Sequence, residues 1–206
     1  EESGNELILE TCKTEQDVID RCKDADVLMT ILVKLNGQVM DACPNLKGLV
    51  RYGIGVDAID INAASQRGIP VCNFTDYCIP EVATHAFSMI LALSRNLPIF
   101  TRNVRQGLWT HGPKGIPMRR ASSRTLGLVG FGSIARELSG YAKAMGYHVI
   151  AYDPFLPADR FAEFGVQQVS KEELFAQADI ISVHTPMTPD TYHMINKDTL
   201  AQMKDG

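Results

Sequence analysis

A glycine-rich turn between an apolar run and a helical pattern limits most strongly how this chain can fold. The run from Thr125 to Val129 is short and apolar, which is typical of a buried strand. The turn follows it directly, with the sequence Gly130-Phe131-Gly132-Ser133-Ile134-Ala135. A helix is predicted from Ser133 to Met145, with Gly146 at its end. Strand, tight turn and closely packed helix in this order predict a βαβ unit in a parallel sheet.

The rest of the chain continues the same alternation of short apolar runs and helical patterns. Two segments carry the sequence of a helix capping box, Thr14 with Asp17 and Ser170 with Glu173. Further strands are predicted at residues 7–9, 25–32, 46–52, 70–73, 148–152, 166–169 and 179–184. Further helices are predicted at residues 14–23, 38–42, 58–66 and 158–164. The fold class is therefore α/β, built on parallel sheets.

One longer helix divides the chain. It is predicted to begin at Pro80, where a missing N–H costs nothing, and to run to about Leu97. Its apolar residues lie almost all round the helix, so we expect it to be buried on both sides, as a helix joining two domains would be. Pro98 marks a break, and residues 107–124 form a surface connection. We therefore expect one domain at residues 1–97 and a second at residues 98–206.

An acidic residue at the end of the next strand makes the glycine motif more specific. Asp153 lies 21 residues after Gly132, where dinucleotide-binding units place a carboxylate that accepts hydrogen bonds from the adenosine ribose. Gly130 would permit the tight turn, and Gly132 would let the backbone approach a pyrophosphate. The free N–H groups of Ser133 and Ile134, together with the helix dipole, would stabilise the negative charge of the pyrophosphate. The motif predicts a bound dinucleotide.

The same carboxylate favours NAD over NADP, because it would repel a 2′-phosphate. No Arg or Lys follows it immediately in Tyr152-Asp153-Pro154-Phe155. Two alternatives stay open at this point: the glycines form a plain strand-to-helix turn, or Asp153 is a turn residue before Pro154.

Composition excludes several other classes of protein. The net charge of -4 and the lack of basic runs do not indicate nucleic-acid binding. No apolar stretch is long enough to span a membrane, and the first residues do not resemble a secretory signal. Five cysteines without CxxC spacing indicate neither a disulfide framework nor a metal site. We expect reduced thiols in a cytoplasmic protein.

Four segments together resemble the D-isomer-specific 2-hydroxyacid dehydrogenase family, on its phosphoglycerate dehydrogenase and C-terminal-binding-protein branch. The segments are Arg51-Tyr52-Gly53-Ile54-Gly55-Val56-Asp57-Ala58-Ile59-Asp60, Glu81-Val82-Ala83-Thr84-His85-Ala86, Leu126 to Ala135, and His184-Thr185-Pro186-Met187-Thr188-Pro189-Asp190-Thr191. The resemblance implies a doubly wound Rossmann domain, incomplete here, preceded by a smaller flavodoxin-like substrate domain.

The resemblance also assigns roles to residues. It implies that the backbone amides of Ile54 and Gly55 hold the substrate carboxylate and that Tyr77 lies beside the substrate. It implies that His184, Thr185, Pro186 and Thr191 join the glycine motif in binding NAD, and that the protein is a homodimer. Each of these residues could instead have a purely structural role. For Tyr77, we give the structural and the functional interpretation equal weight.

The family's general acid/base His, its Glu and its Arg are expected after Gly206, so we identify no catalytic residue within this chain. We read His184 as shaping the nucleotide site and His85 and His111 as structural. The whole protein is expected to transfer a hydride between NAD and a small D-2-hydroxy acid or 2-keto acid. The alternative is an NAD(H)-sensing regulator or corepressor-like protein without turnover. The sequence does not name the hydroxy acid.

Overall fold

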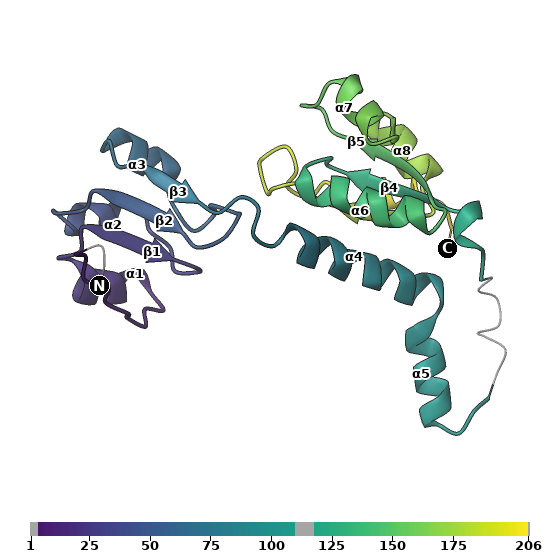
Figure 1. The fold of residues 1–206 in the computed structure, drawn as a ribbon, viewed down its shortest axis with the longest axis horizontal. Coiled ribbons are helices and arrows are strands. Elements are labelled where there is room, and N and C mark those ends of the chain that lie inside the picture. The colour runs from purple at the N-terminus through teal and green to yellow at the C-terminus, as the bar shows by residue number, and fades with distance from the viewer. Residues whose placement is uncertain (1–3, 110–117, 206) are drawn as a thin grey trace. The chain divides into compact units, whose positions relative to one another are not determined.

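The computed structural model describes residues 4–109 and 118–205 (Figure 1). The chain divides into two compact units, unit 1 from Glu1–Tyr77 and unit 2 from Cys78–Gly206. Each unit has its own parallel sheet and its own hydrophobic core. The α/β class with parallel sheets is confirmed. No helix among the described residues has both the length and the apolar character needed to cross a membrane.

Unit 1 is a three-stranded parallel sheet in the order β1-β2-β3, with helices between the strands (Figure 1). Its elements are α1 (Glu15–Cys22), β1 (Val27–Thr30), α2 (Gly37–Ala42), β2 (Gly48–Arg51), α3 (Ile61–Gln66) and β3 (Val71–Asn73). Leu28 and Leu49 of the sheet pack with Val18, Val39 and Ala64 of the helices. The carboxyl end of β2 leads directly into the predicted substrate loop.

The expected strand at residues 7–9 is wrong. These residues have no strand assignment, and the side chains of Leu7, Ile8 and Leu9 are 85%, 68% and 94% exposed. A strand needs a neighbour with which to form its ladder, and no described strand pairs with this segment. The capping box that follows is confirmed, because Thr14 Oγ1 accepts from Asp17 N, and Asp17 Oδ2 accepts from Thr14 N.

Unit 2 is a four-stranded parallel sheet in the order β6-β5-β4-β7. Its elements are α4 (Ile79–Ser94), α5 (Leu97–Arg105), the 3-10 helix η1 (Ala121–Ser123), β4 (Thr125–Val129), α6 (Ser133–Ala144), β5 (His148–Tyr152), α7 (Ala158–Glu163), β6 (Gln167–Gln168), α8 (Lys171–Gln177), β7 (Ile180–Val183) and α9 (Lys197–Leu200). The chain moves outward from β4 to β5 and β6, then returns to place β7 on the other side of β4. This reversal makes the β4–β7 edge a topological switch point, where open α/β sheets bind ligands.

The helix expected to join two domains belongs to unit 2 in the structure, because the division falls between Tyr77 and Cys78 rather than near Leu97. Ala83, Ala86 and Ile90 of α4 are buried in the same core as α6. On another face of α4, Val82, Met89 and Leu93 do not enter the unit 2 core and are 40%, 50% and 68% exposed. The predicted break at Pro98 is present: Asn96 is left-handed, with φ 52°, and α5 begins at Leu97.

Asp179 connects the amino ends of two strands in unit 2. Its Oδ2 accepts from Thr125 N at 2.8 Å, and its Oδ1 lies 3.2 Å from Lys204 Nζ and 3.7 Å from Arg119 Nη1. Burial alone would raise the pKa of Asp179, but the Thr125 hydrogen bond and the two cations outweigh it and lower this pKa.

We expect unit 2 to lose stability in acid through Asp179. A lowered folded pKa contributes stability above the unfolded value, near 3.8, and that stability is lost as pH falls through the folded pKa. Urea unfolding between pH 2 and 7 should therefore show a smaller pH dependence for Asp179→Asn than for the wild type. Asp159→Asn, the same change on α7, is the matched control. Identical profiles for both variants would contradict this role.

Candidate functional site

The glycine-rich turn lies at the switch point of the unit 2 sheet. Its first glycine, Gly130, occupies a position where a residue with a side chain would be strained. Gly130 has φ +86°, and its N–H donates to Tyr152 O at 2.8 Å. A Cβ built on Gly130 would lie 2.9 Å from His184 O, a backbone atom that cannot rotate away. The turn after β4 is therefore pressed against the chain leaving β7. This contact joins two motifs that are 54 residues apart in the sequence.

The second glycine of the turn faces open space. Gly132 is the N-cap residue of α6, and a Cβ built on it would have no heavy atom within 4 Å. No side chain of a described residue caps the helix, so the first N–H groups of α6, from Ser133 and Ile134, remain free for an anion. The helix is held close to the sheet, because Ala135 is fully buried. An open approach to uncapped amides fits a pyrophosphate.

The carboxylate of Asp153 is fixed by the backbone on both sides. Its Oδ2 accepts from Phe131 N at 2.9 Å, and its Oδ1 accepts from Phe155 N at 3.0 Å. The first bond connects the end of β5 to the glycine-rich turn itself. Each carboxylate oxygen keeps a lone pair for a further donor, as ribose hydroxyls would supply. The bond to Phe155 N is one that a turn-forming Asp makes, and the bond to Phe131 N ties Asp153 to the glycine-rich turn, so the geometry is compatible with both interpretations of Asp153.

His184 follows β7 and is half-buried beside the glycine-rich turn. One ring nitrogen, Nε2, lies 2.9 Å from Ser182 Oγ. Burial lowers the pKa of His184, because the charged imidazolium is poorly solvated there. Burial therefore favours the neutral form of the ring, while the contact with the glycine-rich turn is made by the His184 backbone carbonyl.

We expect the His184 ring to titrate below its ordinary value of 6.5. Proton–carbon correlation spectra of the imidazole rings across pH 4–8 measure this midpoint, and His184→Gln assigns the signal by its loss. As pH falls below about 6.5, the unfolded state takes up the proton first, so folding loses stability over that range. A midpoint at or above 6.5 would show that the ring is not desolvated.

The segment after His184 is a loop closed by threonine hydroxyls. Thr191 Oγ1 donates to Pro186 O at 2.6 Å and accepts from Thr188 N at 2.8 Å. The Thr191 hydroxyl is therefore hydrogen-bonded within the loop, where it connects Pro186 and Thr188. His193, just beyond, has a positive φ of 54°.

The predicted substrate residues of unit 1 follow β2. Asn73 Nδ2 donates to Ile54 O at 2.7 Å, which orients the Ile54–Gly55 peptide. No described residue accepts from the amides of Ile54 and Gly55, so both can bind an external acceptor. Tyr77 is 58% exposed at the end of unit 1. Two adjacent free amides fit a small carboxylate.

Sequence reasoning missed two residues that support these loops. Asn73 holds the Ile54 carbonyl, and Ser182 holds the His184 ring. The signal for Ser182 is its spacing, because residues two apart in a strand share one face. The signal for Asn73 is its place at the carboxyl end of β3, next to β2.

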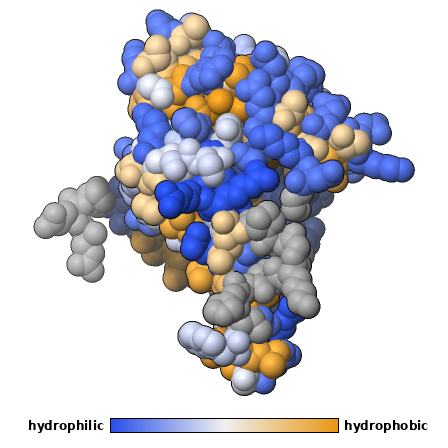
Figure 2. All heavy atoms as spheres, turned by 90° about the vertical axis from the view of Figure 1, so that its right-hand side faces the viewer, coloured by the Kyte–Doolittle hydropathy of each residue, from blue (hydrophilic) through white to orange (hydrophobic). Residues whose placement is uncertain are grey.

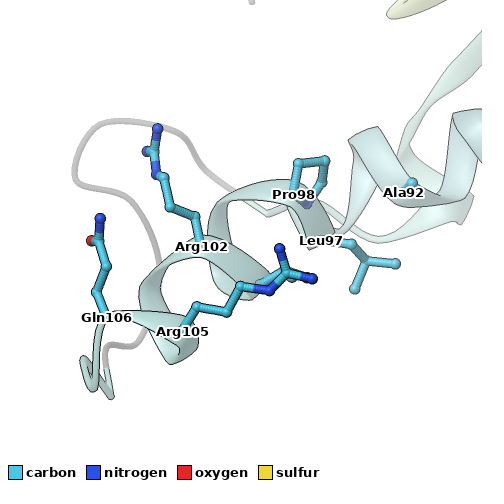
Figure 3. Close-up of a pocket in the computed structure, with 7 residues that line it drawn as sticks. Ala92, Leu97, Pro98, Arg102, Arg105 and Gln106 are labelled. Carbon is cyan, nitrogen blue, oxygen red and sulfur yellow. The ribbon is translucent and has the colours of Figure 1, made fainter.

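Outside these loops, the described residues show neither a metal cluster nor a histidine paired with a carboxylate. No cluster of three or more His, Cys, Asp or Glu side chains could hold a metal. No described histidine forms an ion pair with a carboxylate, and His111 lies outside the described residues. A hollow of about 480 Å³ lies where α4 meets α5 (Figure 3). It is lined by Ala92, Leu97, Pro98, Thr101, Arg102, Arg105 and Gln106. No strand end contributes to it, so it is distinct from the switch point.

Comparison with known proteins gives consistent matches. The model of the D-isomer specific 2-hydroxyacid dehydrogenase NAD binding domain matches residues 87–206. D-3-phosphoglycerate dehydrogenase of Synechocystis sp. is 36% identical over 197 residues, which cover 95% of this chain and 35% of the relative. Hydroxypyruvate reductase of Thermotoga maritima is 35% identical over 205 residues, covering 94% of this chain and 65% of the relative.

A solved structure shows the same similarity in three dimensions. D-lactate dehydrogenase from Aquifex aeolicus, crystallised with NAD and lactic acid, superposes with a TM-score of 0.82 at 32% identity. The match covers 91% of this chain and 56% of that one. The chain spans 35–39% of the length of three curated relatives that it matches.

Proposed function

Because the chain belongs to the D-isomer-specific 2-hydroxyacid dehydrogenase family, we propose that the whole protein is an NAD-dependent oxidoreductase of small D-2-hydroxy acids or 2-keto acids. The observation that carries the proposal is the cradle formed by Gly130, Gly132 and Asp153 at the switch point. Bound NAD would supply the hydride acceptor or, as NADH, the donor. Unit 1 is then the substrate domain, and unit 2 is the NAD-binding domain.

Within unit 2, each proposed contact follows from the local geometry. The uncapped amides of Ser133 and Ile134 bind the pyrophosphate, with Gly130 and Gly132 allowing close approach. Asp153 accepts from the adenosine ribose. The remaining proposed contacts come from the segment after β7, namely His184, Thr185 and Pro186, with Thr191 holding their loop.

Within unit 1, we assign the free amides of Ile54 and Gly55 to the carboxylate shared by 2-hydroxy and 2-keto acids. Asn73 supports this loop through the hydrogen bond that its side-chain amide donates to the Ile54 carbonyl oxygen. Tyr77 is proposed to contact the rest of the substrate. These amides bind the group common to all such acids, so they do not select among them.

We further propose a cytoplasmic homodimer. The five free cysteines support the cytoplasmic location, because disulfides persist mainly in oxidising compartments. Figure 2 shows hydrophobic side chains at the surface near α5, at the lower end of that view, and α4 and α5 expose Met89, Leu93, Leu97 and Val104. Covering such a face is a common function of a homodimer interface. Light scattering after size exclusion tests this assembly, and a monomeric mass would overturn it.

The deciding experiment is a turnover assay with protein expressed from its complete reading frame. NADH absorbance at 340 nm would be followed with glyoxylate, hydroxypyruvate, pyruvate and phosphohydroxypyruvate. We expect NADH oxidation with at least one of these 2-keto acids, and weaker activity for a variant with Gly132→Ala. Binding of NADH without turnover on any of them would instead favour the NAD(H)-sensing regulator.

A further inference from the structure

Unit 1 holds three of the five cysteines close together, outside the proposed substrate loop. Cys12 Sγ lies 4.0 Å from Cys22 Sγ, and Cys43 Sγ lies 3.9 Å from the Cys22 carbonyl oxygen. All five thiols are free in the structure. Neither the proposed dinucleotide site nor the proposed carboxylate site uses any of these three sulfurs.

One pair among the three is placed to form a bond. A disulfide needs about 2.05 Å between sulfurs, so Cys12 and Cys22 must close by roughly 2 Å. Cys22 is the last residue of α1, and Cys12 lies two residues before its N-cap, Thr14. Cys12 belongs to a segment without helix or strand in which Leu9 is 94% exposed, so this side of the pair can move. Cys43 is buried and directs its thiol at a carbonyl rather than at a sulfur.

We propose that Cys12 and Cys22 are an oxidation site, a dithiol that closes to an intramolecular disulfide on exposure to a peroxide. With hydrogen peroxide as the oxidant, the Cys12 sulfur attacks one peroxide oxygen, the O–O bond breaks, and a sulfenic acid and one water form. Cys22 sulfur then attacks Cys12 sulfur. Cys22 attacks as its thiolate, after losing its proton to solvent. The S–O bond breaks, and the leaving hydroxide takes up one proton from solvent to form a second water, so the protons balance. Two thiols lose two electrons in total, and one peroxide gains them.

The surroundings of Cys22 affect the rate of the second step, the attack of Cys22 on Cys12. Burial, followed by the charge of Cys12 and its hydrogen bond, raises the pKa of Cys22 to about 11. The ionisable groups that face it are Cys12 and Glu10 from the preceding segment and Cys43 after α2. Because the thiolate is the nucleophile and burial favours the protonated Cys22 thiol, disulfide closure should be faster at pH 10 than at pH 7.

Peptide mapping after peroxide treatment of the native chain tests the proposal. Trypsin cuts after Lys13, Arg21 and Lys23, so the expected product joins the peptide that contains Cys12 and ends at Lys13 to residues 22–23, and it lacks two hydrogens. Dithiothreitol should release both peptides. Cys72→Ser, which removes an exposed thiol, is the matched control and should leave this product unchanged. Cys22→Ser should abolish it and leave Cys12 as a sulfenic acid or a more oxidised acid.

Two results would overturn the proposal. One is a native protein in which Cys12 and Cys22 oxidise separately, or in which either joins Cys43, Cys72 or Cys78 instead. The other is the same distribution of linkages in urea as in buffer, since the two residues are close in sequence and the fold would then not select the pair. The wild-type map decides both without relying on the folding of any variant.

Discussion

Gly130→Ala is expected to abolish detectable NADH binding and to destabilise unit 2 by about 2–5 kcal/mol. Two costs add at this position. The residue has φ +86°, which L side chains rarely adopt, and the new Cβ would lie 2.9 Å from His184 O. Relieving the contact would separate the turn after β4 from the loop after β7, and the turn carries the two glycines of the cradle. Binding and stability should therefore fail together.

Substitutions at two other glycines, Gly132 and Gly140, distinguish a loss of NADH binding from a loss of stability. Gly132→Ala meets no heavy atom within 4 Å and has an ordinary φ of -72°, so unfolding should be nearly unchanged. Its methyl group would nevertheless occupy the approach to the uncapped amides, so NADH affinity should fall at least tenfold. Gly140→Ala, within α6 and also unhindered, should keep wild-type affinity and gain up to about 1 kcal/mol of stability.

NADH fluorescence titration and urea unfolding measure both quantities for the three variants. Wild-type NADH affinity in Gly132→Ala would show that the pyrophosphate does not approach this glycine. Wild-type affinity and stability in Gly130→Ala would contradict the close contact with His184 itself. The unchanged Gly140→Ala protein would show that neither result is a general effect of adding a methyl group to this helix.

The sequence predicted those elements whose causes are local. The strand, turn and helix around Gly130 and the capping boxes at Thr14 and Ser170 depend on residues within a few positions of each other, and all are present. The site residues of unit 2 could also be chosen from sequence, because the carboxyl ends of parallel strands meet at one edge of a sheet.

The remainder depends on neighbours that sequence spacing does not reveal. Residues 7–9 have a strand-like composition, but no described strand pairs with them. The division between the units falls before α4 because this helix packs against α6 (Ser133–Ala144), which is distant from it in the sequence. The Asn73–Ile54 bond and the Gly130–His184 contact likewise join segments that only the folded sheets bring together.

Asp153→Asn is expected to weaken NADH binding by about 10- to 100-fold and to reduce the preference for NADH over NADPH. The carboxylate now accepts two backbone hydrogen bonds, from Phe131 and Phe155, and keeps lone pairs for the ribose hydroxyls. An amide has one oxygen instead of two and no charge, so it cannot replace all of these acceptors. Removal of the charge also removes the repulsion of a 2′-phosphate.

Parallel titrations with NADH and NADPH separate the two contributions. We expect NADPH affinity to rise, or to fall far less than NADH affinity, because only the NADPH complex gains from the lost repulsion. Asp159→Asn, the same change at an exposed carboxylate of α7, should leave both affinities unchanged. An equal loss for both nucleotides would mean that Asp153 acts only by shaping the turn through Phe131 N. An unchanged ratio with unchanged affinities would place the ribose elsewhere and remove the structural reason for preferring NAD.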